Sequence, residues 1–274
     1  MFIEKRRNRM KVFISADIEG VNGICSWKET EYGHLRYAEF KKQMTAEVNA
    51  ACLGAWAAGA GDILIKDAHD SAMNIDINGL PSYVRLHRGW EGSLCSMMAG
   101  IEEGFDAVIF IGYHSPSRSD GNSLSHTMNT SINHIKINNE IASEFLINSL
   151  YASSLGIPVA FLSGDLHLTK LVLETNKNIE IVATKEGRGG AALSKHPSIT
   201  NEEIKVGVQR SLSKDLSNNL VPLPKDFHIE IQYRNHIQAY KASHFPGCKL
   251  IEPDILYYYA KDYHDVLKMF MFNL

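Results

Sequence analysis

The chain has 274 residues, of which 45% are hydrophobic and 22% charged, so it is long enough for one large globular domain or one domain with an elaborated end. The net charge of -3, with Lys and Arg scattered along the chain, argues against nucleic acid as a partner, and no apolar run is long enough to span a membrane. The four cysteines lie far apart without a C-x-x-C pair, which favours reduced thiols and a cytoplasmic location.

The first ten residues form a basic stretch, with Lys5, Arg6, Arg7 and Arg9. No long apolar segment follows them, so they do not resemble a secretory signal. An anion-binding arm is one interpretation. The favoured alternative is that these residues are a disordered extension, or that they come from a start codon upstream of the true start at Met10. We treat 1–10 as an N-terminal extension.

Apolar strands and amphipathic helices then alternate along the chain. Strands are predicted at 12–14, 62–66, 83–86, 106–111, 158–162 and 179–183, and helices at 36–58, 94–103, 141–155 and 168–175. Residues 123–128 and 134–137 are predicted to be extended. The strand–helix–strand order predicts an α/β fold in which a mostly parallel sheet is flanked by helices.

The pattern changes after Gly187. A glycine-rich turn is followed by Thr200 and Glu203, which are spaced as a capping box that would open a helix, and 227–231 alternates as a half-buried strand. The sequence therefore predicts a metal-binding α/β domain at 11–187, on grounds given next, and a smaller α+β domain at 188–274.

Polar side chains follow three of the predicted strands. Asp17 and Glu19 lie two residues apart after the first strand, so both point to the same side, and two like charges held this close favour a cation between them. His69 and His114 follow two further strands, and the carboxyl ends of parallel strands meet at one edge of a sheet. Each residue alone could be an ordinary turn or loop residue. Together, imidazole and carboxylate ligands suit Zn²⁺ with a position left open for water, which indicates hydrolytic chemistry.

Five segments, in this order and spacing, resemble the D-aminopeptidase family of the bacterial dipeptide-transport operon, the binuclear zinc peptidases of family M55. They are Asp17-Ile18-Glu19-Gly20, Asp67-Ala68-His69, Gly112-Tyr113-His114, Ser125-His126-Thr127-Met128, and Ile137-Asn138 followed by Glu144. The resemblance implies that zinc is bound by Asp17, Glu19, His69, His114 and Glu144, with Asp17 bridging two ions, and that His126 is the catalytic residue. It also implies a ring-shaped homo-oligomer, expected to be a decamer, whose active sites face an internal chamber.

The resulting expectation is a zinc-dependent aminopeptidase that hydrolyses short peptides with N-terminal D-amino acids, such as D-Ala-D-Ala. Two zinc ions per chain are expected, and Mn²⁺ or Co²⁺ would also accept these ligands. A metallophosphoesterase and a non-catalytic, metal-stabilised binding protein are the alternatives. The first is disfavoured because the chain lacks an Asp-x-His start and a Gly-Asn-His-Asp/Glu segment.

Three residue roles remain open from the sequence. Glu144 could instead be a solvated acid favoured by the N-terminus of its predicted helix. Asp165, at the end of the strand 158–162 region, could orient a ligand histidine or serve only the turn. His126 could act as nucleophile or as proton shuttle, and the shuttle is favoured because two metal ions already make water a strong nucleophile.

Overall fold

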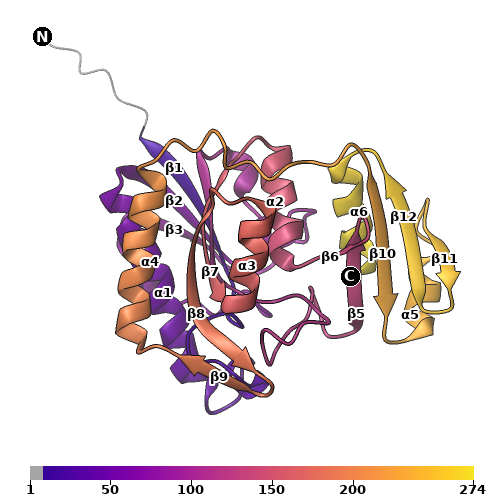
Figure 1. Cartoon of the computed structure of the whole chain (residues 1–274), viewed down its shortest axis with the longest axis horizontal. Coiled ribbons are helices and arrows are strands. Elements are labelled where there is room, and N and C mark those ends of the chain that lie inside the picture. Colours follow the sequence, from indigo (N-terminus) through magenta and orange to yellow (C-terminus); the bar gives the residue numbers. More distant parts are fainter. Residues whose placement is uncertain (1–8) are drawn as a thin grey trace, which may run out of the picture.

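The computed structural model describes residues 9–274, so most of the predicted N-terminal extension lies outside the described residues. Within that range no helix is both long enough and apolar enough to cross a membrane. Two sheets dominate the structure, and Figure 1 shows them side by side.

The larger sheet has seven strands in the order β3-β2-β1-β4-β7-β8-β9. Its strands are β1 (Met10–Ala16), β2 (Ala60–Asp67), β3 (Val84–His87), β4 (Ala107–Tyr113), β7 (Val159–Asp165), β8 (Glu180–Arg188) and β9 (Ala191–Ser194). Every neighbouring pair is parallel except β8 and β9. The carboxyl ends of β1, β2 and β4 therefore meet at one edge, as the sequence predicts.

Helices cover both faces of this sheet. The helices α1 (Tyr37–Ala57) and α4 (Pro197–Leu212) pack together on one face, and α2 (Glu144–Ser154) and α3 (Leu166–Thr175) lie on the other. Each face of the sheet packs in a hydrophobic core of its own, and successive residues of β1 alternate between the two. Val12 and Ile14 lie in the core under α1 and α4, and Phe13 lies in the core under α2 and α3. The predicted α/β class, a mostly parallel sheet flanked by helices, is confirmed.

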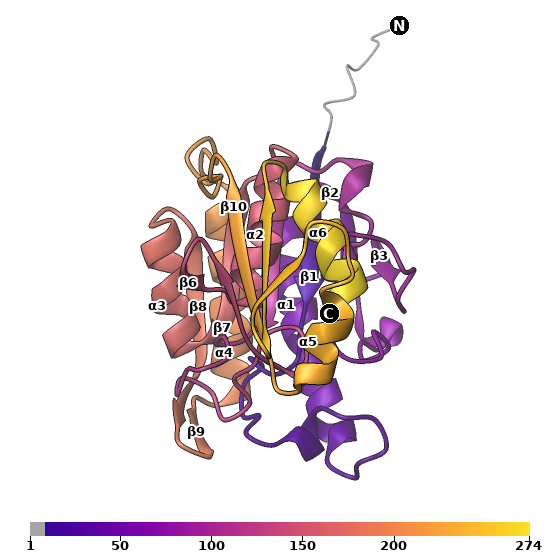
Figure 2. The ribbon, with the colours of Figure 1, turned by 90° about the vertical axis from the view of Figure 1, so that its right-hand side faces the viewer.

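The smaller sheet is antiparallel, with the order β11-β12-β10-β5-β6. It contains β5 (Ile132–Ile137), β6 (Glu140–Ile141), β10 (Phe227–Tyr233), β11 (Lys249–Glu252) and β12 (Ile255–Ala260), and carries α5 (His236–Ala242) and α6 (Tyr263–Asn273). Both helices lie on the same side of the strands in Figure 2. The two sheets do not divide the chain at the predicted boundary of 187. β5 and β6 precede it but join the smaller sheet, whereas β9 and α4 follow it but pack with the larger sheet.

Three local predictions are wrong. Residues 94–103 form two short 3₁₀ turns, Ser96–Met98 and Ile101–Glu103, because Gly100 between them has a φ of +97°, which no continuous right-handed helix allows. The helix expected to open at Thr200 begins at Pro197 instead, with His196 as its N-cap. Residues 123–128, predicted to be extended, form a loop with a turn at Ser123 and Leu124 and a left-handed Met128.

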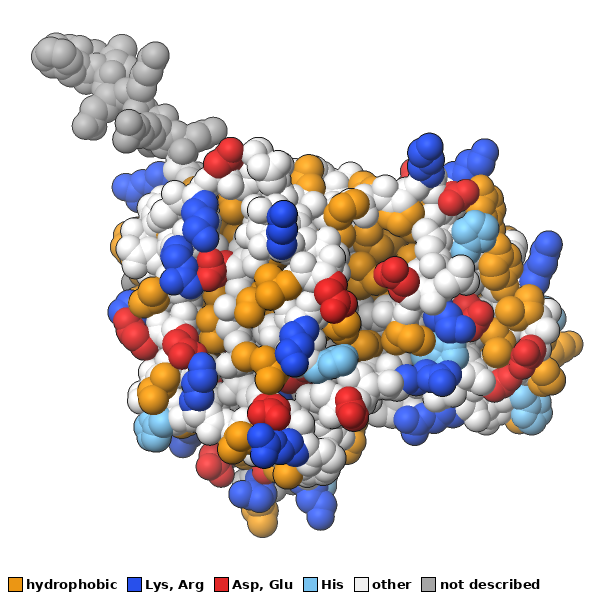
Figure 3. Space-filling view, viewed as in Figure 1, with side chains coloured by type: hydrophobic (Ala, Val, Ile, Leu, Met, Phe, Trp, Pro, Cys, Tyr) orange, Lys and Arg blue, Asp and Glu red, His pale blue; other side chains and the backbone are white. Residues whose placement is uncertain are grey.

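The surface drawn in Figure 3 carries Lys and Arg side chains interspersed with Asp and Glu, without a patch of one sign. Hydrophobic side chains gather in a hollow between the two sheets. This hollow corresponds to a cavity of about 880 Å³ between α2, α3 and the β5–β6 hairpin.

Candidate metal centre

Six side chains converge at the carboxyl edge of the larger sheet, and we call them the centre. Asp17 and Glu19 follow β1, His69 follows β2, His114 follows β4, His126 lies in the loop between β4 and β5, and Glu144 opens α2. All are buried except His126, which is partly exposed. These are the six residues that the sequence and the resemblance single out, and the structure brings every one of them together.

Two glycines allow the ends of β1 and β4 to approach closely. The Gly20 N–H donates to the Gly112 carbonyl at 2.8 Å. A Cβ on Gly20 would overlap the carbonyl oxygen of Tyr113, and one on Gly112, whose φ is +70°, would overlap that of Asp17. Any other residue at either position would push the segment after β1 away from β4.

The first half of the centre is built around His69. Its Nε2 lies 3.0 Å from the Thr30 carbonyl oxygen, which can only accept, so Nε2 carries the proton. The other ring nitrogen, Nδ1, then faces Asp17 Oδ1 at 3.3 Å and Glu19 Oε2 at 3.0 Å. A ligand histidine whose other nitrogen is fixed by a backbone carbonyl is the usual arrangement at metal sites.

The second half repeats this arrangement around His114. Its Nδ1 donates to the Ser115 carbonyl at 2.9 Å, and its Nε2 faces Asp17 Oδ2 at 3.4 Å and Glu144 Oε2 at 3.5 Å. The two oxygens of Asp17 thus face different histidines. This is the geometry that a bridging carboxylate requires.

Three buried atoms of the centre have no hydrogen-bond partner within the described part of the chain: Asp17 Oδ2, Glu19 Oε2 and His114 Nε2. Leaving such groups unsatisfied is costly, and all three point inward. Ligand atoms lie within 4.8 Å of one another in three groups: Asp17 with Glu19 and His69, Asp17 with His114 and Glu144, and Glu19 with His114 and His126. The nitrogen and oxygen donors fit zinc, and the third group shows that His126 is also within reach of an ion.

The charges of the centre are strongly coupled. Burial, and then Glu19, raise the pKa of Asp17 well above its usual value, whereas His69 outweighs burial and holds the pKa of Glu19 well below its own. Burial lowers the pKa of His114, but the carboxylates of Glu144 and Asp17 outweigh it and raise that pKa to about 10. The carboxylates outweigh burial at His69 as well, so its pKa is also well above the usual value. Without a cation, protons on the histidines balance the carboxylates, and a metal ion would displace them.

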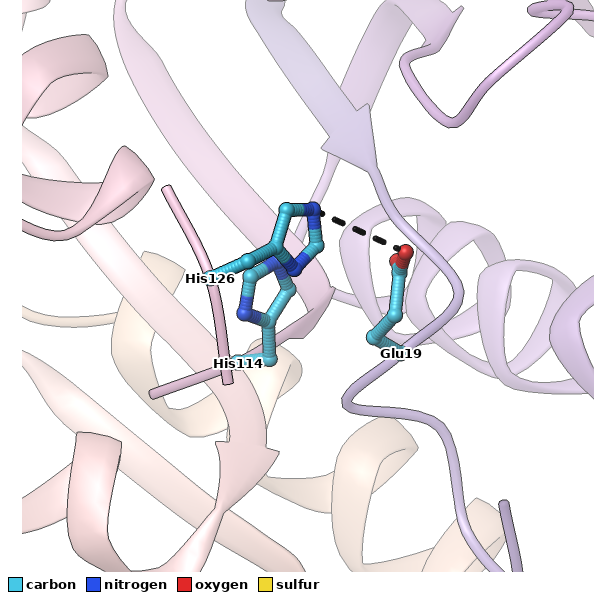
Figure 4. Close-up of side chains that lie close together, drawn as sticks. All are labelled: Glu19, His114 and His126. Atoms are coloured by element: carbon cyan, nitrogen blue, oxygen red, sulfur yellow. Dashed lines mark ion pairs between the residues drawn. The ribbon is translucent and has the colours of Figure 1, made fainter. Parts of the chain in front are cut away.

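His126 differs from the other two histidines. Its Nδ1 donates to the Leu124 carbonyl at 2.9 Å, so its unprotonated Nε2 faces the centre, 3.9 Å from Glu19 Oε1 and 3.7 Å from Glu144 Oε1. Its ring stacks on that of His114 with 4.4 Å between centroids, as Figure 4 shows. Burial, followed by the neighbouring His114, lowers the pKa of His126. His126 is therefore a neutral imidazole that can take up a proton at Nε2.

Glu144 is not the solvated acid of the alternative interpretation. It is buried, and its Oε1 accepts a hydrogen bond from Met128 N at 2.7 Å. The Ser143 side chain caps α2 instead, by accepting from Leu146 N. Burial raises the pKa of Glu144, but His114 outweighs burial and lowers it.

A second buried polar cluster adjoins the centre, and we call it the support network: Asp165, Ser115, Asn122 and Lys185. Asp165 accepts from Ser115 N at 2.6 Å, from Ser115 Oγ at 2.5 Å and from Asn122 Nδ2 at 3.2 Å. Asp165 also caps α3. It therefore supports His114 through the Ser115 carbonyl and does not contact the ring, so both sequence interpretations of Asp165 contain part of the answer.

Lys185 is the member that sequence reasoning missed. Its ammonium is buried and donates to the Glu19 carbonyl at 2.5 Å and to the Ile24 carbonyl at 2.6 Å. Asn122 Nδ2 donates to the same Glu19 carbonyl at 3.0 Å. Burial lowers the pKa of Lys185 to about 8, against the opposing effect of Asp165. No local motif marks this lysine, which lies on β8, far along the chain from the segment it holds.

The centre opens into a cavity of about 340 Å³, which we call the metal cavity. Trp27, Glu31, Trp90 and Met128 line it together with residues of the centre. Its volume is at the small end of the range for ligand pockets, about 300–1,000 Å³. A small molecule of dipeptide size fits a cavity of this volume.

Comparisons with known proteins agree with this geometry. A family model described as D-aminopeptidase, Peptidase_M55, matches residues 10–272. A D-aminopeptidase of Bacillus subtilis (strain 168) is 26% identical over 246 residues, which cover 88% of each chain. A solved structure described as the Zn-dependent D-aminopeptidase DppA from Bacillus subtilis, a self-compartmentalizing protease, is similar with a TM-score of 0.89 and 25% identity over 96% of each chain.

Proposed function

The chain belongs to the D-aminopeptidase family of peptidases, M55, and from this membership and the geometry of the centre we propose that it is a zinc-dependent aminopeptidase that cleaves short peptides with N-terminal D-amino acids. The observation that carries the proposal is the pair of histidines whose inward-facing ring nitrogens lie against carboxylates, together with three buried atoms that have no hydrogen-bond partner in the described part of the chain. Such an arrangement is completed by divalent cations.

Two zinc ions per chain are proposed, with Asp17, Glu19 and His69 holding one and Asp17, His114 and Glu144 the other. Mn²⁺ or Co²⁺ would accept the same donors. When bound, such ions polarise a carbonyl and make water more acidic. The zinc dependence of the DppA relative supports the choice of metal for that protein and, by similarity, for this one.

His126 is proposed as the group that moves the proton. Its Nε2 is unprotonated and within reach of the centre, so it can take a proton from the attacking water and return it to the amine that leaves. Trp27 packs edge-on against the His126 ring at 5.2 Å between centroids, which restricts its orientation. A neutral base held in place needs no reorganisation before the proton transfer.

The test is an activity assay with zinc supplied, on D-Ala-D-Ala, on L-Ala-L-Ala and on an aryl phosphate. Cleavage of D-Ala-D-Ala in preference to the other two supports the proposal. Faster release of the aryl alcohol would favour the metallophosphoesterase alternative. Full metal occupancy without turnover of any of the three would favour a metal-stabilised binding protein.

From the family resemblance, and from a relative described as self-compartmentalizing, we propose a ring-shaped homo-oligomer, expected to be a decamer, with the centres facing an enclosed chamber. Sedimentation should then give a particle many times the mass of one chain, and tripeptides should be cleaved where casein is not. A monomer that degrades casein would contradict the proposal. We also propose a cytoplasmic location, for which the widely spaced cysteines are the support.

A further inference from the structure

A second cavity, of about 380 Å³, adjoins the metal cavity, and we call it the α6 cavity. The two cavities have four lining residues in common: Trp90, Ser96, Met128 and Asn129. Met128 also donates its backbone N–H to Glu144, a member of the centre. A ligand held at the centre can therefore extend directly into the α6 cavity.

The walls of the α6 cavity are mostly apolar. Leu94 lies on one side, and α2 and α6 supply Ile147, Leu267, Phe270 and Met271 on the other. In Figure 1, α6 lies between α2 and the strands of the smaller sheet, and it packs on α2. The cavity therefore lies where α6, which packs on the smaller sheet, meets the carboxyl edge of the larger sheet.

Three polar side chains of this cavity are engaged by the protein itself. Asn129 Nδ2 donates to the Leu274 carbonyl at 3.0 Å, and Asn148 Nδ2 donates to the Tyr113 hydroxyl at 3.0 Å. The Cys95 thiol contacts Glu102 at 2.5 Å. Glu91, Ser93 and Ser96 also line the cavity, but apolar side chains make up most of its wall, so the cavity favours an apolar ligand.

We propose that the α6 cavity receives a large apolar side chain from one of the two residues that flank the scissile bond. This inference rests on the proposed peptidase function and adds a preference for leucine-like or phenylalanine-like residues over alanine. The metal cavity holds the peptide backbone, and the side chain enters between Met128 and α6. An apolar pocket of this kind typically discriminates by about tenfold or more between side chains that differ in size.

Met271 is the residue best suited to a test, because it lines the α6 cavity and is 44% exposed, so it can be replaced without disturbing the core. M271W narrows the cavity and M271A widens it. The matched control is F272W, at the next position of α6. Phe272 is 69% exposed and packs against Phe245, away from the α6 cavity.

Two dipeptide series, X-D-Ala and D-Ala-X with X as D-Ala, D-Leu, D-Phe or D-Glu, are assayed on the zinc-loaded protein. In one series we expect kcat/KM for D-Leu or D-Phe to exceed that for D-Ala about tenfold. M271W should reduce this ratio about tenfold, M271A should move it toward D-Phe, and F272W should leave it unchanged.

Two results would overturn the inference, and they are distinguishable. If D-Ala-D-Ala is cleaved but neither Met271 variant changes the ratios in either series, the α6 cavity is not a side-chain subsite and the proposed function stands. If no peptide is cleaved by the unsubstituted protein, the proposed function fails and the subsite fails with it. A faster turnover of D-Glu peptides than of D-Leu peptides in both series would also contradict an apolar subsite.

Discussion

The centre and the support network are both largely buried clusters of polar and charged residues at the same edge of one sheet, and they differ in how their polar atoms are satisfied. In the support network, Asp165 accepts from Ser115 and Asn122, and Lys185 donates to two carbonyls. In the centre, three buried atoms have no partner among residues 9–274. Two adjacent buried polar clusters therefore differ in that the support network is hydrogen-bonded within the protein, whereas part of the centre is not.

The difference indicates which cluster is completed by the protein and which by something added to it. Buried charges are stable when paired and hydrogen-bonded, and costly when they are not. The support network meets this condition and acts as a rigid frame. The centre meets this condition only when a cation replaces the protons that the histidines hold. Its inward-facing oxygen and nitrogen atoms are therefore available to bind a metal ion.

Removing Asp17 should have the largest effect on this contrast. Asp17→Ala removes the one carboxylate that faces both His69 and His114, so we expect it to lose more metal than His69→Ala or His114→Ala. Activity should fall by more than about 100-fold, because that is the upper end of the loss seen when a residue that only orients a metal ligand is replaced. Elemental analysis of the purified variants measures the first and kcat/KM the second. Metal-free protein with full activity would end the metal-centre interpretation.

Replacing His126 should separate metal binding from catalysis. His126→Ala is expected to retain the bound metal and the fold while kcat falls by about 10²–10⁴-fold, as for loss of a general acid–base group. Metal analysis and steady-state kinetics on the same preparation measure both.

The other outcomes for His126→Ala are equally informative. Loss of metal would make His126 a ligand, which the group it forms with Glu19 and His114 permits. An unchanged kcat would remove it from the mechanism. An acyl-imidazole trapped by rapid quench in the unsubstituted protein would make it the nucleophile in place of the proton shuttle.

Glu47 offers a third way of handling a buried carboxylate. Its Oε1 accepts from Asn22 N at 2.9 Å and from Gln43 Nε2 at 3.0 Å, but its Oε2 has no partner in the described part of the chain. Burial raises the pKa of Glu47 from 4.5 to about 7. Lys185 opposes this shift, but burial outweighs it, so Glu47 is neutralised by a proton of its own below about pH 7.

The pH dependence of stability follows from that shift. Between about pH 4.5 and 7 the folded chain holds a proton on Glu47 that the unfolded chain has released, so the free energy of unfolding falls as the pH rises, by about 3 kcal/mol in total. Glu47→Gln cannot ionise. Relative to the unsubstituted protein, it should therefore be more stable at pH 8 than at pH 5 by about that amount, measured by denaturant unfolding with chelator present.

The exposed Glu39 on the same helix provides the control, since Glu39→Gln should leave this pH dependence unchanged. If Glu47→Gln follows the same pH profile as the unsubstituted protein, the buried carboxylate is not the group that titrates.

The centre was more predictable from the sequence than the frame that holds it. Asp17, Glu19, His69 and His114 each follow an apolar strand, and parallel strands bring such positions to one edge, so their convergence follows from local patterns. Glu144 and His126 have no such signal, and only the family resemblance singles them out. The two glycines that let β1 and β4 approach depend on backbone contacts that no spacing reveals.

The frame is long-range and uses backbone groups. Lys185 contacts Glu19 across 166 positions of the chain, and it does so through a carbonyl that every residue possesses. The helix predicted at 94–103 is wrong for a related reason, because the left-handed Gly100 fits against Leu64 and His87 of neighbouring strands. Such contacts are decided by packing between distant segments, and composition and periodicity carry no record of them.

Lys185→Met should have the smallest effect and the most specific one. Methionine keeps the length of the side chain but removes the two hydrogen bonds to the Glu19 and Ile24 carbonyls, leaving Asn122 as the remaining donor to Glu19. We expect the zinc affinity to fall by about 10–100-fold, the usual cost of losing a group that positions a ligand.

The chelator-treated protein should not lose stability to match, because burial of the ammonium lowers its pKa to about 8 and so already opposes folding at neutral pH. Zinc affinity, measured by chelator competition, should thus fall without a matching fall in the stability of the metal-free protein, which a general loss of packing cannot produce. Lys195→Met, which removes an exposed pair with Glu203, should change neither by more than about 0.5 kcal/mol. If Lys185→Met binds zinc as tightly as the unsubstituted protein, the support network does not position the centre, and the two clusters are neighbours without being coupled.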